Sequence, residues 1–304
     1  MSDIIEVPLI PDCSACIVNS LKTMIPLLTE DEARRFHLFN LAYRRISEGY
    51  AKNLTPIILS VSLYQELYSE GDIDDPYREI KQRSTSAALK ALPIVEKKMD
   101  KYEGRDYFRA CIAASITGNV IDFNTSEHTP DLDKLVDVFD EVIKQGFALD
   151  DSDHLWETLR SKKGNVMFLA DNAGEVILDI PLLRFIRDSG WDITFVVKGK
   201  AMINDVTRED VRGTEIEELS TVIDSGGWAH GVPKQFVSSE FIKLFGESDL
   251  VISKGQANIE TVPEIQAQTC VETYYITKAK CSHISQAINA KKGDNVVIRR
   301  QSCP

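Results

Sequence analysis

Three short polar segments could carry chemistry, because each follows a run of apolar residues that is typical of a buried strand. They are Asp171-Asn172-Ala173-Gly174-Glu175, Asn204-Asp205 and Lys254-Gly255-Gln256. In an open parallel sheet the carboxyl ends of the strands share one edge, and ligands bind there. We therefore expect acids, amides, a glutamate and a lysine from the three segments to converge on one site.

Asp171 and Asn172 present an electrostatic conflict that indicates a cation. A helix that begins near Ala173 or Gly174 would present backbone N–H groups suited to an anion such as phosphate, whereas the Asp171 carboxylate would repel that anion. A divalent cation resolves the conflict, since carboxylate, amide and phosphate oxygens are hard ligands that suit magnesium or manganese. Asp205 can supply a second carboxylate. The plain alternative is that Asp171-Asn172 only caps a helix, a position that both residue types favour.

Lys254 stands directly after the third apolar run and before a glycine. A lysine in that position can place a compact positive charge on a phosphate while charge shifts in a transition state. Taken alone it could equally be an ordinary solvated lysine. The coincidence of three such segments at one sheet edge favours a functional site.

The elements that must position these residues change in character along the chain. Helix-start signals such as Thr29 with Glu32 and Thr55-Pro56 predict a helical first half. Strands alternate with helices in the second half, which predicts a doubly wound, mostly parallel α/β sheet of Rossmann-like type. We expect an all-helical N-terminal domain over residues 1–155 and an α/β domain over 156–304. The strands are predicted at 165–170, 191–197, 221–223, 249–253, 273–277 and 295–299.

Charge and composition narrow the classes of partner. The 304 residues include 47 acids against 35 lysines and arginines, a net charge of −12. Such a chain repels nucleic acid and anionic membranes, so an anionic partner must be small and locally neutralised. No run approaches the ~20 apolar residues of a membrane span, and the first ten residues do not resemble a signal peptide. We expect a cytoplasmic protein, whose six cysteines are too few and scattered for a disulfide framework.

As an ordered set, the motifs resemble those of the metal-dependent damage-control phosphatases, a family first catalogued as domain of unknown function 89. The resemblance spans nearly the whole chain, and the Cys-x-x-Cys together with the compact length is similar to the stand-alone, archaeal-type branch. The matching segments are Cys13-Ser14-Ala15-Cys16, Gly118-Asn119-Val120-Ile121-Asp122, Asp171-Asn172-Ala173-Gly174-Glu175, Asn204-Asp205-Val206-Thr207, Gly226 with Gly231, and Lys254-Gly255-Gln256-Ala257-Asn258.

The resemblance implies hydrolysis of phosphomonoesters carried by small phosphorylated metabolites. It implies one divalent metal ion (Mg, Mn, Co or Ni) held by Asp171, Asn172 and Asp205, and a phosphate contact from Lys254. Either water or Asp171 attacks phosphorus. Glu175 would lie close to the metal or accept a proton, and the helical half would reach into the site. The implied substrate-binding set is Asn119, Asp122, Gly174, Glu175 and Gly255.

Two other classes of function stay open on the sequence alone. An adenosyl-methionine-dependent methyltransferase could use the same sheet, although no Gly-x-Gly-x-x-Gly follows the first predicted strand. A non-enzymatic metal or redox protein could be built on Cys13 and Cys16. A zinc site normally needs four protein ligands, and the sequence has no second Cys-x-x-Cys to complete one.

Overall fold

The structure, a computed structural model, describes residues 5–71, 73–120 and 132–301 and is built around one sheet of seven strands. Neighbouring strands lie in the order β1-β7-β6-β5-β2-β3-β4. All pairs are parallel except β6 with β7. The strands are β1 (Leu149–Asp150), β2 (Asn165–Leu169), β3 (Asp192–Val197), β4 (Thr221–Asp224), β5 (Leu250–Lys254), β6 (Thr273–Lys278) and β7 (Asn295–Arg300).

The strand order reverses between β2 and β5, which lie next to each other at the centre of the sheet. From β2 the chain proceeds outward to β3 and β4, whereas from β5 it proceeds the other way to β6 and β7. Such a reversal opens a crevice at the carboxyl ends of the two central strands. The predicted fold class is confirmed, and its switch point falls between the segments that begin at Asp171 and Lys254.

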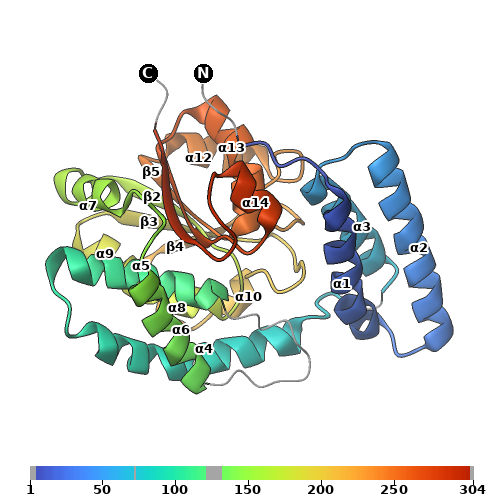
Figure 1. Cartoon of the computed structure of the whole chain (residues 1–304), viewed down its shortest axis with the longest axis horizontal. Helices are drawn as coiled ribbons and strands as arrows, with labels where there is room; N and C mark the ends of the chain where they lie inside the picture. The colour runs from blue at the N-terminus through green and yellow to red at the C-terminus, as the bar shows by residue number, and fades with distance from the viewer. Residues whose placement is uncertain (1–4, 72, 121–131, 302–304) are drawn as a thin grey trace.

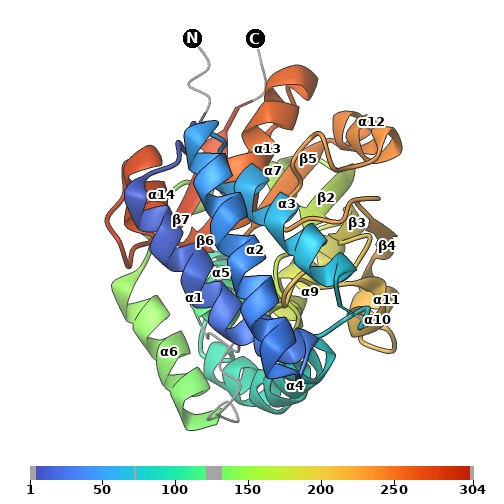
Figure 2. The same cartoon turned by 90° about the vertical axis from the view of Figure 1, so that its right-hand side faces the viewer.

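Helices cover both faces of the sheet, and α1 to α3 lie beside it (Figure 1). Helices α1, α2 and α3 run side by side across the front of the view in Figure 2. The first six helices are α1 (Pro11–Leu28), α2 (Glu32–Ala51), α3 (Pro56–Ser69), α4 (Arg78–Met99), α5 (Gly104–Val120) and α6 (Leu132–Gln145). The others are α7 (Ser152–Ser161), α8 (Glu175–Leu178), α9 (Ile180–Asp188), α10 (Arg208–Val211), α11 (Ile216–Leu219), α12 (Ser239–Glu247), α13 (Gln256–Thr269) and α14 (Ser282–Ala287).

Strand residues alternate between two buried cores, as the period of two requires. Phe168 of β2 stacks on Phe195 of β3 in the core that α4 to α9 cover, with ring centroids 5.4 Å apart. Met167 and Leu169 face the opposite core, under α12 to α14. Both faces of the sheet are therefore buried, which explains why the predicted strands are continuous apolar runs.

A third core holds α1, α2 and α3 together and includes one residue from the second half of the chain, Met202. By contrast, α5 and most of α4 belong to the core of the sheet, although Ile80 of α4 packs in the third core. Strand β1 precedes the predicted domain boundary at residue 155 and nevertheless pairs with β7. The division into residues 1–155 and 156–304 therefore stays a prediction.

One helix cap differs from the sequence-based expectation. Thr55 caps α3 as predicted, but α2 is capped by Asp31, not Thr29, because the Asp31 carboxylate accepts from Arg34 N at 2.9 Å. Within the described ranges no helix is long and apolar enough to cross a membrane.

Lys81 is an ionic link between the helical half and the α/β half. Its side chain is 1% exposed, and its ammonium lies 2.7 Å from Asp75 and 2.8 Å from Asp210 of α10. We predict that Lys81→Ala lowers the free energy of unfolding by about 3 kcal/mol, because two largely buried carboxylates lose their cation. Urea denaturation measures the change.

The matched control is Lys243→Ala, whose exposed ammonium lies 3.7 Å from Glu247. An exposed pair of this kind contributes under about 1 kcal/mol, so this variant should unfold like the wild type. Equal losses in the two variants would contradict the proposed link.

Candidate active site at the sheet edge

The loops that follow β2 and β3 are joined by backbone hydrogen bonds. Asn172 and Asp205 form an isolated antiparallel bridge, in which Ala173 N donates to Asn204 O at 2.9 Å. Val206 N donates to Asp171 O at 3.0 Å on the other side of the bridge. The backbone therefore places two of the three segments side by side, as the strand-end argument predicts.

The third segment reaches the same point through Gly255. This residue has φ +79° and ψ 166°, a conformation that is essentially restricted to glycine. A Cβ atom at this position would overlap the carboxylate of Asp171. The glycine predicted to lie in the site thus makes room for the Asp171 carboxylate at the end of β5.

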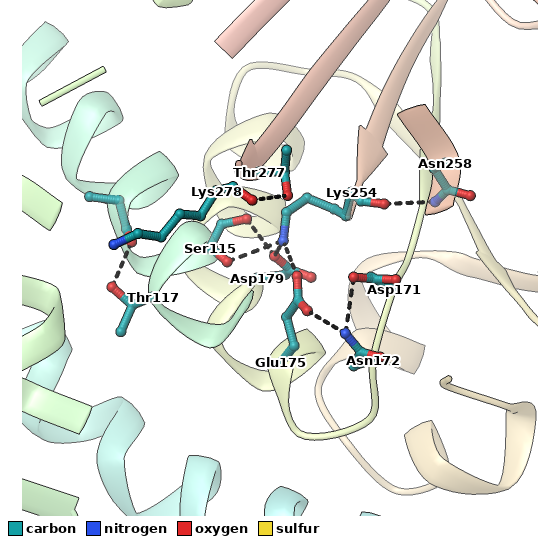
Figure 3. A network of polar contacts seen from close by, with 11 residues as sticks. Ser115, Thr117, Asp171, Asn172, Glu175, Asp179, Lys254, Asn258, Thr277 and Lys278 are labelled. Carbon is teal, nitrogen blue, oxygen red and sulfur yellow. Dashed lines mark hydrogen bonds and ion pairs between the residues drawn. The ribbon is translucent and has the colours of Figure 1, made fainter. Parts of the chain in front are cut away.

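Lys254 lies in a closed network of buried charges, shown in Figure 3. Its fully buried ammonium donates to Glu175 Oε1 at 2.7 Å, to Asp179 Oδ1 at 2.8 Å and to Ser115 O at 3.1 Å. These three acceptors match the three N–H donors of a lysine. Burial raises the pKa of Asp179 to about 6, against the opposing pull of Lys254. The predicted contact between Lys254 and a phosphate stays a prediction.

The same network fixes the orientation of the Asn172 side chain (Figure 3). Its amide nitrogen donates to Asp171 Oδ2 at 3.0 Å and to Glu175 Oε2 at 3.2 Å. With both N–H groups directed at carboxylates, the amide oxygen of Asn172 is the atom that can act as a ligand. Lys254 donates to Glu175, and Glu175 accepts from Asn172, so Lys254 orients Asn172 through Glu175.

Asp171 and Asp205 are two buried acids in mutual repulsion. Burial raises the pKa of Asp171 well above its ordinary value, and the charges of Glu175 and Asp205 raise it further. Burial likewise raises the pKa of Asp205 to about 6, although Lys198 opposes this shift. Asp205 Oδ2 makes no hydrogen bond and lies 3.6 Å from Lys198 Nζ. An additional cation would relieve both carboxylates.

The donor set fits a hard divalent ion that keeps several ligands from outside the protein. Among the described side chains, no group of three or more His, Cys, Asp or Glu is arranged to hold a metal. Asp171, Asn172 and Asp205 offer two carboxylates and one amide oxygen. Mg²⁺ typically binds through one or two carboxylates and completes its shell with water and substrate phosphate oxygens.

A cleft of about 1170 Å³ lies between α3 and α4 on one side and the ends of β3 and β4 on the other, and Asp171, Asn172 and Asp205 are not among the residues that line it. Lys198 lines it and also lies 3.6 Å from Asp205, so it joins the cleft to the acids. Sequence reasoning missed this lysine. The signal was available, since Lys198 directly follows β3 as Lys254 ends β5. Other lining side chains are Tyr68, Arg78, Lys200, Arg208 and Trp228.

The remaining predicted residues are only partly described. Gly174, with φ +81°, packs against Ser84 of α4, where a Cβ atom would come within 2.8 Å of the Ser84 Cβ. Gly118 of α5 packs against the backbone of Glu175. Asn119 follows in the last turn of α5, but its side chain lies outside the described set, and Asp122 lies outside the described residues altogether.

Cys13 and Cys16 lie in the first turns of α1, and both are free thiols. Burial raises the pKa of Cys13, and the neighbouring Cys281 and Glu260 raise it further. A reactive redox thiol needs the opposite shift. Cys270, in contrast, is disulfide-bonded.

Comparison with known proteins gives consistent matches along almost the whole chain. The model of the damage-control phosphatase ARMT1-like domain matches residues 9–296. A damage-control phosphatase of Pyrococcus horikoshii is 31% identical over 291 residues, which cover 95% of this chain and 97% of the relative. One of Archaeoglobus fulgidus is 25% identical over 287 residues, 94% and 97% of the two chains. A solved DUF89 family structure from P. horikoshii has a TM-score of 0.85 at 30% identity, covering 97% of this chain and 99% of that one.

The space that Gly255 leaves for Asp171 gives a testable expectation. Gly255→Ala should lower the free energy of unfolding by roughly 3 kcal/mol, because conformational strain adds to a clash with a buried carboxylate. Gly293→Ala is the control, since Gly293 has φ +97° but nothing within 4 Å of an added Cβ. It should lose only about 1 kcal/mol, from strain alone. Identical losses by chemical denaturation would mean that the carboxylate is not packed against Gly255.

Proposed function

The chain belongs to the damage-control phosphatase ARMT1-like domain family, and on that premise we propose that it hydrolyses small phosphomonoesters with one divalent metal ion. The proposed substrates are damaged or side-product phosphate metabolites, because the relatives are damage-control phosphatases. The cytoplasmic location predicted from the sequence stays part of the proposal. The ion would be Mg²⁺, Mn²⁺, Co²⁺ or Ni²⁺, all of which accept oxygen ligands.

One observation carries the proposal: backbone bonds hold Asp171 and Asp205 side by side in a buried place, where their charges oppose each other. Asp171, Asn172 and Asp205 would hold the metal. When bound, it would neutralise the carboxylates and the phosphoryl oxygens and so lower the cost of charge that develops in the transition state. The phosphoryl group would be attacked by a water molecule or by Asp171.

The chain's own residues prepare this site before substrate arrives. Lys254 and Glu175 fix the amide of Asn172, and Gly255 admits the carboxylate of Asp171. A ligand set held in place by its neighbours costs little reorganisation when the reaction occurs. In this proposal Lys254 supports the ligand set from within the protein.

Lys198 is the better placed of the two lysines to contact the phosphate. It lines the cleft, and its ammonium makes one hydrogen bond, to Gly231 O at 3.0 Å, besides its looser approach to Asp205. Lys254 would have to give up one of three close acceptors to bind a phosphate. The cleft volume of about 1170 Å³ leaves room for the remainder of a metabolite.

The proposal predicts metal-dependent release of phosphate. A panel of phosphomonoesters should be hydrolysed in the presence of Mg²⁺, Mn²⁺, Co²⁺ or Ni²⁺, and chelator should abolish the activity. Asp171→Ala should lower kcat/KM by at least ~10²-fold, since it removes a metal ligand. Asp192→Ala changes an exposed acid paired with Arg187 and should retain full activity. Equal activity in both variants, or none on any ester, would overturn the assignment.

A second prediction separates the two lysines. At saturating Mn²⁺, Lys198→Met should weaken inhibition by inorganic phosphate roughly tenfold or more, because a charged hydrogen bond to phosphate is lost. Lys254→Met should keep its phosphate affinity but lose about 3 kcal/mol of unfolding free energy, since Glu175 and Asp179 stay buried without their cation. The reverse pattern would assign the phosphate contact to Lys254.

A further inference from the structure

We infer that Tyr68 of α3 is a positioning residue for Asp205, because its hydroxyl holds Ile203 in the left-handed backbone conformation that presents Asp205 to the site. The expected effect on metal affinity rests on the proposed metal site. The contacts that join Tyr68 to Ile203 do not depend on that proposal.

Ile203 has φ +45°, in the left-handed region. The other non-glycine residues with positive φ in the described part of the chain are two asparagines and one cysteine, so Ile203 is the only β-branched one. A β-branched residue in this region is a genuine outlier, and such strain persists only where the surroundings hold it.

The strained residue is held by a hydrogen bond from the helical half of the protein. Ile203 N donates to Tyr68 Oη at 2.9 Å, across 135 positions of sequence. Directly after it, Asp205 N donates to Met202 O at 3.1 Å and closes a turn over residues 202–205. The conformation at Ile203 therefore acts together with the bridge to Asn172 in placing the Asp205 carboxylate.

Two further contacts dock the same turn onto α1 to α3. Met202 is fully buried in the core of these three helices. Trp228 Nε1 donates to Ala201 O at 2.8 Å, and the Trp228 ring meets Tyr68 edge-on, with centroids 6.2 Å apart. Met202 and Ala201 are thus fixed by packing and by a hydrogen bond, directly before Ile203 in the chain.

Tyr68 and Trp228 also line the cleft of about 1170 Å³. A molecule bound there would touch the side chains that hold the turn. Tyr68 and Trp228 therefore lie between a molecule bound in the cleft and the turn that places Asp205, one of the proposed metal ligands.

The test compares Tyr68→Phe with Tyr275→Phe, since the Tyr275 hydroxyl is buried without a hydrogen-bond partner. Hydrogen exchange in metal-free protein should become faster over residues 201–206 in Tyr68→Phe only. Mn²⁺ affinity, measured by electron paramagnetic resonance, should fall roughly five- to thirtyfold, the equilibrium cost of the left-handed conformation for a non-glycine residue. Unchanged exchange over 201–206 in Tyr68→Phe overturns the inference.

A rescue experiment tests the route through Ile203. Asparagine adopts the left-handed conformation more readily, so Ile203→Asn should restore Mn²⁺ affinity and slow exchange in the Tyr68→Phe background. Failure to restore either would show that the hydroxyl does not act through this residue and would overturn the inference. If the wild type binds no Mn²⁺, the proposed metal function fails, while the exchange data still decide the role of Tyr68.

Discussion

The repulsion between two buried carboxylates is the constraint on which the rest of this structure depends. Burial raises the pKa of both Asp171 and Asp205, and the charge of Asp205 raises the pKa of Asp171 further, so their side chains alone do not favour this arrangement. What keeps them together is backbone: the bridge between Asn172 and Asp205, and the parallel strands β2 and β3 that lead into it. Backbone pairing therefore holds a local arrangement of charges that is unfavourable by itself, as is common at functional sites.

The surrounding charges are arranged in layers around this pair. Lys254 with Glu175 and Asp179 forms an inner ionic cluster that is closed to solvent, whereas Lys198 lies between Asp205 and the cleft. The inner cluster holds Asn172 in orientation through Glu175. We therefore propose different roles for two buried lysines at corresponding strand ends: Lys254 supports the metal ligands, and Lys198 contacts the phosphate.

Local patterns predicted much of this arrangement, because strand-end chemistry depends on residues that are adjacent in sequence. The runs before Asp171 and Lys254 identified both strands, and the parallel fold then required their ends to meet. The partners of Lys254 were beyond prediction, since a lysine after a strand looks the same whether it is solvated or paired with Asp179. Tyr68 could not be inferred either. Its hydroxyl contacts Ile203 only because α3 packs against the turn at residues 202–205. The positive φ of Ile203 cannot be predicted from the residue type, since isoleucine rarely adopts it.

The central claim is that a divalent ion relieves the conflict between Asp171 and Asp205. The most direct test is a crystal structure of the protein grown with Mn²⁺, with the ion located by its anomalous scattering. The account predicts one strong peak within bonding distance of oxygen atoms from Asp171, Asn172 and Asp205. A peak bound elsewhere, or none at these three side chains in the presence of saturating Mn²⁺, would contradict it.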